Sequence, residues 1–530
     1  MAISPKRILL IYYNRNDSNN TRLTITQHLR ALDASDTKHE IVYHNAFDDY
    51  SSSDLGEEPL QAPPCARASD FEAVILHYSF LAFHWHELAL LRWKRLFSWI
   101  GDMDCLKVAI PQDEYDRAGL LDEWLFDWGV AVVFSCFDEE RRGPLYPFTR
   151  NTAQFHHCLT GYIDDQTAQQ YAKRLLPPNE RPFDIVYRSR HLPFWFGSAG
   201  QLKHRLGEIV APRAQAMGLR CDVSTRDEDA ILGTRWLDFM ASSRAVIGCE
   251  SGVSVVDWYG EVEARVRAIL RAEPTLSFEE VSLRMPPGWD SQRFFAISPR
   301  HLEAVITKTC QILVEGDYSG VLKPDRHYIP LKRDFSNLNE VLAKLQDNAL
   351  VEEIVECAYN DIYLSGRYSY RAFAHQIEQA FFDQLRDDGP EPILIMQEKE
   401  KNQITDKTLL ILERQLNSER HNNTLLEAKL LESRNHFEGL QVQIHRRADE
   451  LQSQINSLQE QTHIRADTLQ EQIHALQEQT KVQAIDLDIL KSLLTVKRKK
   501  VILFLTVIVF GSTIISNILL ILIMGLLRLL

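Results

Sequence analysis

The sequence has no surplus of positive charge, no closely paired cysteines and no secretory leader pattern. Its 59 Lys and Arg are outnumbered by 73 Asp and Glu, a formal net charge of −14, whereas proteins that bind nucleic acid usually present a basic face. The eight cysteines lack a C-x-x-C spacing, which indicates reduced thiols and neither a disulfide framework nor a zinc site. The opening MAISPKRILLIYYN has only a short apolar run, as expected of a first strand and not of a signal peptide.

Apolar runs rich in valine and isoleucine recur along residues 1–388, with helical patterns between them. The expected strands are RILLIYY (7–13), EIVYHNAF (40–47), EAVILHYSF (72–80), LKVAIPQ (106–112), GVAVVFSCF (129–137), FDIVYRSR (183–190), LRCDVST (219–225), RAVIGCESG (244–252), CQILVEG (310–316) and HYIPL (327–331). Such strands indicate parallel sheets covered on both faces. Because LLPPNERP (175–182) breaks the series, the sequence predicts an α/β fold of two tandem Rossmann-like, doubly wound domains, residues 1–180 and 181–388.

A polar segment almost without glycine or proline follows the break at Gly389-Pro390-Glu391-Pro392. LQEQ recurs in it at 458, 469 and 476, so leucines are spaced by seven and by eleven residues. That spacing predicts a linker over 389–400 and a heptad coiled coil with a stutter over 401–496. The coil would be a stalk and could make the protein a homodimer; a single solvated helix is the alternative.

The segment Val501–Leu527 contains no charged residue, and about 20 apolar residues suffice to span a bilayer. Lys497-Arg498-Lys499-Lys500 stands immediately before it, and such clusters tend to stay in the cytoplasm. We therefore expect a single transmembrane helix at 501–527 as a C-terminal membrane anchor, with the bulk of the chain in the cytoplasm.

Polar residues follow the expected strands of the second domain, where ligands of such sheets bind. Cations beside a helix N-terminus suit a diphosphate, and the first-turn carboxylate Glu303 suits the paired hydroxyls of a ribose. Taken singly, each has a simpler explanation as a solvated charge, a turn residue or a carboxylate favoured by the helix dipole. The candidate donor-binding residues are Arg188, Arg190, Lys203, Glu250, Ser251, Gly252, Ser298, Arg300, Glu303, Glu315 and Gly316.

Several segments carry a resemblance to a known family. They are YRSR with Lys203 downstream, RAVIGCESGVSVVD, SPRHLEAVITKTCQILVEG and HYIPLKRDFSNLNEVLAKLQD. On these, residues 183–345 resemble the donor-binding half of a GT-B glycosyltransferase, in the spore-maturation-type group classed with families 1 and 4. The resemblance implies sugar transfer from a nucleotide-sugar. It also implies that Arg188 or Arg190, with Lys203, holds the diphosphate and that Glu303 holds the ribose.

Departures from the family pattern support a second hypothesis. Many retaining members carry a glutamate eight residues before the ribose-binding one, where this chain has Phe295. Asn14-Arg15-Asn16-Asp17 replaces a glycine pair after the first strand, and Leu302 and Lys308 replace a phenylalanine and a glycine. The alternative is therefore a non-catalytic, membrane-anchored scaffold that keeps a degenerate GT-B fold and acts through its coiled coil.

The leading hypothesis is a glycosyltransferase whose acceptor is a membrane-proximal glycan, lipid-linked precursor or protein. Helix dipoles and cations can stabilise a leaving diphosphate, so we expect no metal and no cofactor besides the nucleotide-sugar substrate. A general base must face the acceptor, and Asp113 and Glu114, at the end of the strand LKVAIPQ, are the catalytic candidates. His77, His84 and His86, at the end of another strand, are further candidates for the base, but histidines in an apolar stretch are more often hydrogen-bonded core residues.

Overall fold

The computed structural model describes residues 5–15, 22–52, 60–62, 71–384 and 471–472. The chain divides into two units at residue 394, and the description concerns the first. The predicted linker, nearly all of the predicted coiled coil and the predicted transmembrane segment lie outside the described residues. Among the described helices, none is long and apolar enough to cross a membrane.

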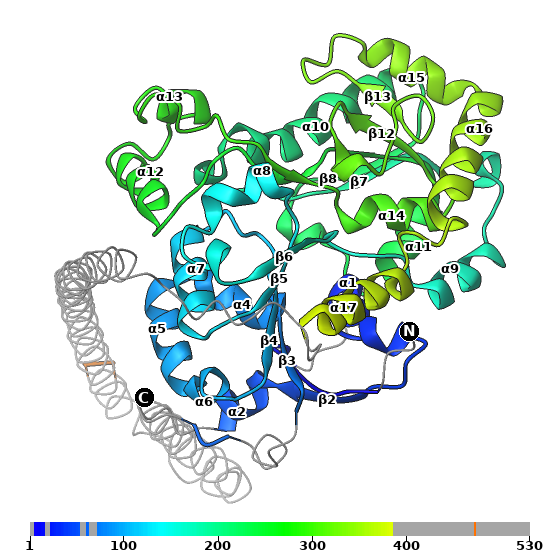
Figure 1. Ribbon diagram of the computed structural model, residues 1–530. Helices are drawn as coiled ribbons and strands as arrows, with labels where there is room; N and C mark the ends of the chain where they lie inside the picture. Colours follow the sequence, from blue (N-terminus) through cyan, green and yellow to red (C-terminus); the bar gives the residue numbers. More distant parts are fainter. Residues whose placement is uncertain (1–4, 16–21, 53–59, 63–70, 385–470, 473–530) are drawn as a thin grey trace, which may run out of the picture. The chain divides into compact units, whose positions relative to one another are not determined.

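Six parallel strands form the first sheet, in the order β2-β1-β3-β4-β5-β6 (Figure 1). They are β1 (Arg7–Tyr12), β2 (Glu40–Asn45), β3 (Ala73–His77), β4 (Leu106–Ile110), β5 (Val132–Ser135) and β6 (Gln154–His157). Five of them confirm expected strands. The sixth, β6, lies in a stretch where no strand was expected, because QFHH lacks the valine and isoleucine that mark the others.

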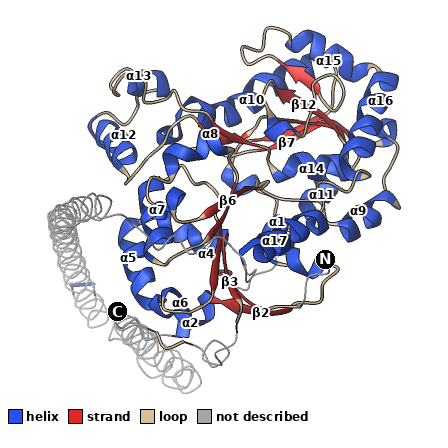
Figure 2. Ribbon diagram, viewed as in Figure 1, coloured by secondary structure: helices blue, strands red, loops and turns tan. Residues whose placement is uncertain are grey.

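Helices cover both faces of this sheet (Figure 2). They are α1 (Leu23–Leu29), α2 (Ala46–Ser52), α4 (Tyr78–Leu81), α5 (Glu87–Leu96), α6 (Ser98–Gly101) and α7 (Ala118–Asp127). Of the remaining helices in this half, α8 (Glu139–Arg142) buries none of its residues, and α9 (Asp165–Ala172) packs with the second sheet and its helices. Alternate residues of β1 face opposite sides: Leu9 packs in a cluster with Trp93 and Trp124, and Ile8 in one with Leu29. This alternation makes a strand buried on both faces read as a continuous apolar run.

Five parallel strands form the second sheet, in the order β13-β12-β9-β7-β8. They are β7 (Phe183–Arg188), β8 (Cys221–Ser224), β9 (Ser243–Gly248), β12 (Cys310–Val314) and β13 (Ile329–Leu331), and all five were expected. One face packs against α10 (Gly197–Ala216), α15 (Leu338–Gln346) and α16 (Asn348–Ala358). The other packs against α11 (Arg235–Ala241) and α14 (Pro299–Ile306). The predicted α/β fold with two parallel sheets is thus confirmed.

Short turns connect these elements. They are the 3₁₀ turns η1 (Ala31–Ala34), η2 (Ala82–Trp85), η3 (Gly143–Leu145), η4 (Thr149–Asn151), η5 (Pro178–Glu180), η6 (Phe194–Phe196), η7 (Asp227–Asp229) and η8 (Tyr318–Gly320), and the π-helical turn η9 (Tyr359–Tyr363). The turn η6 directly precedes α10, and the turn η8 follows the end of β12.

An excursion from the second sheet joins the two halves of the unit. It leaves through β10 (Ser251–Val253), which pairs with β11 (Phe294–Ala296), and contains α12 (Glu261–Ala272) and α13 (Phe278–Ser282). Its Asp257 and Trp258 carbonyls accept hydrogen bonds from the amides of Ala118 and Gly119 at the start of α7, each at 3.0 Å. Arg117 adds an ion pair with Glu263 at 2.5 Å. Backbone pairing therefore fixes the second half on the first.

The last described helix, α17 (Tyr370–Gln384), returns to the first sheet. Its buried Phe373, Ile377 and Phe381 recur at helical spacing and share a cluster with Ile8 and Ile75. The predicted boundaries place this helix with residues 181–388. It packs instead against the first sheet. Its apolar face and residues of α1 and η1 together cover the same side of that sheet.

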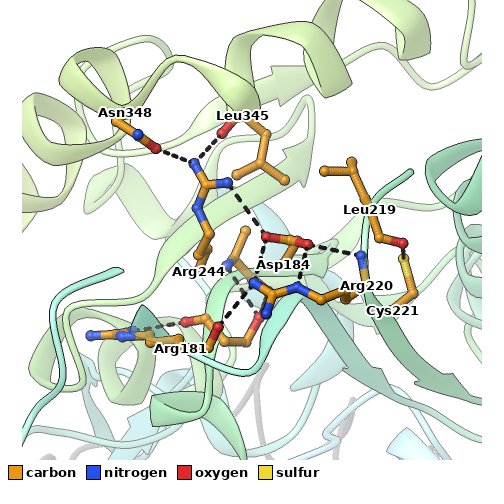
Figure 3. A network of polar contacts seen from close by, with 10 residues as sticks. Arg181, Asp184, Leu219, Arg220, Cys221, Arg244, Leu345 and Asn348 are labelled. Carbon is orange, nitrogen blue, oxygen red and sulfur yellow. Dashed lines mark hydrogen bonds and ion pairs between the residues drawn. The ribbon is translucent and has the colours of Figure 1, made fainter. Parts of the chain in front are cut away.

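A polar network closes the amino-terminal side of the second sheet (Figure 3). Figure 3 shows the Asp184 carboxylate between Arg220 and Arg244, with N–O distances of 3.1 and 3.4 Å. Burial alone would raise the pKa of Asp184, but hydrogen bonds from Arg220 hold it below its ordinary value. Arg181, 1% exposed, donates to the carbonyl of Ser243 at 2.8 Å. This network is structural and lies at the strand ends opposite to the candidate site.

The prediction of Glu114 as a catalytic base is not supported by the structure, because Glu114 is fully buried. The chain turns at Asp113, whose φ of +53° directs the next residue into the core. There the carboxylate accepts hydrogen bonds from Ser135 Oγ at 2.6 Å, the Cys136 amide at 2.7 Å and Tyr146 Oη at 2.5 Å. Despite these bonds, burial raises its pKa to about 7.

Replacing Glu114 by glutamine should remove a pH dependence of stability. The native state binds this proton more tightly than the unfolded chain, where the pKa is near 4.5. The contribution of Glu114 is therefore complete below pH 4.5 and lost as the pH rises through 7. Relative to Glu114→Gln, the wild-type free energy of unfolding should fall by ~2–3 kcal/mol from pH 5 to pH 8. Denaturant unfolding at both pH values measures it; a pH-independent difference would contradict it.

Candidate functional site

The carboxyl-terminal edges of the two sheets meet through contacts between residues far apart in sequence. Thr24, at the start of α1, donates from Oγ1 to Glu303 Oε1 of α14 at 3.2 Å. Thr160, shortly after β6, donates from Oγ1 to the Ile297 carbonyl at 2.5 Å. In each half the strand order reverses beside the first strand, at β1 and at β7, and such switch points are where ligands of doubly wound sheets bind.

Four cations gather at these edges: Arg22, Arg190, Lys203 and Arg300, here called the cationic cluster. Loss of solvent and the like charges of Arg190 and Arg300 lower the pKa of Arg22. Burial, together with Arg300 and Arg22, likewise lowers the pKa of Lys203. Like charges within electrostatic reach raise the free energy of the unliganded protein. An anion bound among them would relieve this repulsion.

The members of the cationic cluster keep hydrogen-bond donors available. Lys203 Nζ donates to the Gly252 carbonyl at 3.3 Å, and Arg300 donates to the Arg188 carbonyl at 3.2 Å. With the residues that the structure describes, Arg190 forms no hydrogen bond or ion pair. An ammonium has three N–H donors and a guanidinium five, so these side chains can bind several oxygen atoms of a phosphate group.

Glu303 is held beside the cationic cluster by one donor on each of its oxygens. Trp236 Nε1 donates to Oε2 at 2.8 Å, and Thr24 donates to Oε1. Burial raises the pKa of Glu303, while these bonds and the charges of Arg300 and Arg22 oppose the shift. A carboxylate has about four acceptor positions, so two are available for a pair of hydroxyl groups.

Asp113 is the exposed carboxylate of the pair predicted as catalytic. It receives a hydrogen bond from Tyr115 Oη at 2.6 Å, and its charge acts on both Arg22 and Lys203. The αL backbone at Asp113 thus leaves one carboxylate facing the cationic cluster and sends the next, Glu114, into the core.

The prediction that Arg188 binds the diphosphate is not supported by its contacts. Its guanidinium donates to Asp222 Oδ1 at 2.7 Å, to the Asp222, Tyr187 and Asp229 carbonyls, and stacks over the Phe239 ring. Four of its five N–H groups are used in this way. Arg188 therefore fixes the end of β8, and Arg190 is the arginine of YRSR that belongs to the cationic cluster.

The other predicted donor-binding residues are divided between two places. Ser298 precedes α14, and its amide donates to His301 Nδ1 at 3.1 Å. Glu250 accepts from the amides of Asp317 at 3.1 Å and Tyr318 at 2.9 Å, which orders the chain after β12. Ser251 and Gly252 belong to β10, and Gly316 packs so closely on Glu250 that a side chain there would collide with it. Glu250 and Glu315 line a small pocket with Ala199, Leu202, Cys249, Phe295, Val314 and Arg333.

The N-terminus of α10 already carries a carboxylate of the protein. Asp290, from the excursion, accepts hydrogen bonds from the Ser198 amide at 2.9 and 3.1 Å and from Ser254 Oγ. Gly197 has a φ of +72°, and a side chain there would strike Asp290. A helix N-terminus is a usual anion site, but here Asp290 fills it, so the cationic cluster is the better place for a phosphate.

Of the three histidines at and after the end of β3 that were expected to be core residues, His77 and His84 are buried and His86 is not. His77 Nε2 lies 3.1 Å from Nδ1 of His28, and burial lowers the pKa of His77 well below its ordinary value and that of His28 to about 3. His84 is bonded to the Leu81 carbonyl at 2.7 Å, and burial lowers its pKa to about 4. His86 is exposed.

Sequence reasoning missed Arg22, Thr24, Trp236 and Asp290. Arg22 and Thr24 follow the polar loop after the first strand, and the only signal was their place beside a strand end. Trp236 and Asp290 lie outside the strand ends altogether, and nothing in their spacing marks them.

The sequence matches no protein-family model and no curated protein. The fold is similar to solved structures that each cover about seven tenths of this chain. HepE of Anabaena in complex with UDP has 10% identity and a TM-score of 0.37, with 71% of this chain and 99% of that chain covered. An alpha-glucosyltransferase in complex with UDP-glucose and DNA has 10% identity, a TM-score of 0.41 and the same coverage. Sucrose-phosphate synthase of Thermosynechococcus elongatus has 12% identity, a TM-score of 0.36, and 72% and 99% coverage.

Proposed function

We propose that this protein is a glycosyltransferase that takes its sugar from a nucleoside diphosphate donor. The observation that carries the proposal is the cationic cluster beside Glu303, at the strand ends where the two sheets meet. A nucleoside diphosphate presents two charged phosphates next to a ribose with paired hydroxyls. The positive charge of the cationic cluster suits the phosphates, and the carboxylate of Glu303 beside it suits the ribose hydroxyls.

The cationic cluster binds the diphosphate and stabilises the negative charge that grows on it as the bond to the sugar breaks. Cations already in place at such a site cost no reorganisation during the reaction. Glu303, oriented by Trp236 and Thr24, accepts hydrogen bonds from the ribose. Asp113, exposed and within electrostatic reach of the cluster, is the proposed base that removes the proton of an attacking acceptor hydroxyl. Its charge also balances part of the cluster when no ligand is bound.

The sequence of the C-terminal region supports a membrane-proximal acceptor. With residues 501–527 in a membrane and 401–496 as a stalk, the site would act on a membrane-proximal glycan, lipid-linked precursor or protein from the cytoplasmic side. Tethering raises the effective concentration of an acceptor in the same membrane.

A non-catalytic scaffold is the second candidate. Arg188 and Glu114 are occupied by internal hydrogen bonds, and Asp290 fills the N-terminus of α10. Phe295 stands where a family glutamate is expected and lies 5.9 Å from the guanidinium of Arg333. A scaffold of this kind would bind no nucleoside diphosphate.

Nucleotide binding tests the proposal. In thermal-shift measurements of the full chain with UDP, GDP, ADP, CMP and dTDP, one nucleotide at about 100 Kd should stabilise the protein by about 2.7 kcal/mol. Glu303→Gln should weaken that binding about tenfold or more, because hydrogen bonds to a charged group contribute about 1.5–3 kcal/mol. Glu352→Gln, an exposed residue of α16, is the matched control.

The 2′-deoxy form of the bound nucleotide separates ribose recognition from a general loss of structure. Wild-type protein should lose affinity for the deoxy form, and Glu303→Gln should show little further loss. Equal losses for both proteins would remove Glu303 from the ribose site. Absence of a shift with all five nucleotides would favour the scaffold.

Asp113→Asn should separate catalysis from binding. If Asp113 is the general base, the rate of nucleoside diphosphate release from the donor should fall about 10²–10⁴-fold. The affinity for the nucleotide should be unchanged or higher, because a negative charge beside the diphosphate is removed. Steady-state kinetics and titration calorimetry measure the two quantities; a rate within threefold of wild type, on the order of 0.7 kcal/mol, would rule out this role.

A further inference from the structure

We infer that His191, His204 and Glu208 form a binding site for one divalent transition-metal ion, Zn²⁺ by its chemistry. One ligand atom from each of these residues lies within 4.8 Å of those of the other two. His191 Nε2 and Glu208 Oε1 are 3.9 Å apart, and the two imidazole rings stack with centroids 4.0 Å apart and planes inclined by 28°. None of these residues belongs to the cationic cluster or to the proposed reaction.

The donor set is that of a zinc site. Zn²⁺ is bound by histidine nitrogen at about 2.0–2.1 Å and by carboxylate oxygen at about 2.0–2.2 Å, with tetrahedral geometry. Ligand atoms around such an ion are therefore roughly 3.4 Å apart. The present separations, up to 4.8 Å, are longer than this, so binding requires the ligand atoms to move closer together. Water would complete the coordination, since these three protein ligands leave one position open.

Rigid backbone supports two of the ligands. His204 and Glu208 are four residues apart on the 20-residue helix α10 and share one face of it. Leu206 and Val210 of the same helix are fully buried against the second sheet. The pair is thus held in place, and only His191, in the loop between β7 and η6, has to move toward it.

A nitrogen of the group has no other partner. Nδ1 of His204 is buried and makes no hydrogen bond to the part of the chain that the structure describes. Buried polar atoms are normally hydrogen-bonded, and an unsatisfied one is costly. Glu208 is exposed, and its one ion-pair contact with a described residue is the long one to His191 at 3.9 Å. A metal ion between the three residues would give the His204 nitrogen a partner and would balance the charge of the Glu208 carboxylate.

Metal binding would fix the loop at residues 189–193 against α10. Arg190 of the cationic cluster is the neighbour of His191 in that loop. The metal would act as a structural ion that limits where Arg190 can lie, and it would take no part in sugar transfer. The site stands whether or not the protein binds a nucleotide.

Titration of the chelator-treated full chain tests the inference. Calorimetry with Zn²⁺ should show one equivalent bound, and Co²⁺ should give the intense visible absorption of a low-symmetry nitrogen–oxygen site. Both should weaken at least about tenfold in His191→Ala and in Glu208→Gln. The matched controls His86→Ala and Glu352→Gln, exposed residues elsewhere, should bind as wild type does.

Two results would overturn the inference. One is the absence of Zn²⁺ and Co²⁺ binding by the wild-type chain. The other is binding that His191→Ala and Glu208→Gln leave unchanged, which would place the ion elsewhere. Circular dichroism of each variant shows that it is folded, and because both residues are exposed, two independent substitutions are available for the same conclusion.

Discussion

Hydrogen bonds between the backbone of residues 257–258 and that of residues 118–119 hold the two α/β halves of this protein in one unit. The Arg117–Glu263 ion pair and the return of α17 to the first sheet strengthen the same connection. This connection helps to assemble the cationic cluster, because Arg22 belongs to one half and Arg190, Lys203 and Arg300 belong to the other. The candidate site therefore depends on both halves and is not formed by either sheet alone.

Electrostatics then explains why this place is suited to a ligand. The chain as a whole is strongly acidic, yet four cations lie within electrostatic reach of one another, and among the described residues Asp113 and Glu303 supply negative charge beside them. Repulsion within the cluster and partial loss of solvent lower the pKa of Arg22 and Lys203. Such an arrangement stores unfavourable energy in the unliganded state, which a bound diphosphate would reduce.

Much of the fold could be predicted from sequence, because strands buried on both faces are continuous apolar runs that need no knowledge of tertiary contacts. The site was predicted less well. The end of a predicted strand indicates which residues lie near the edge of the sheet. The direction of each side chain there depends on the conformation of the following turn, which the strand pattern does not predict. At Asp113 a turn with positive φ leaves one carboxylate exposed and buries the next, Glu114. At the end of β7, Arg188 forms an ion pair with Asp222, so Arg190 is the arginine available at the site. Arg22 was missed because its role depends on its proximity to Arg190, Arg300 and Lys203 of the other half, which is a tertiary contact.

The most direct test of the account is the affinity of Arg22→Ala for the nucleoside diphosphate that wild type binds, measured by calorimetry beside that of the nucleoside alone. Arg22 is the only member of the cationic cluster from the first half. The account predicts that diphosphate affinity falls about tenfold or more, as for loss of a charged hydrogen bond, while nucleoside affinity is unchanged. Arg271→Ala, exposed on α12, should bind as wild type does. Equal diphosphate affinity in Arg22→Ala and wild type would contradict a site built from both halves.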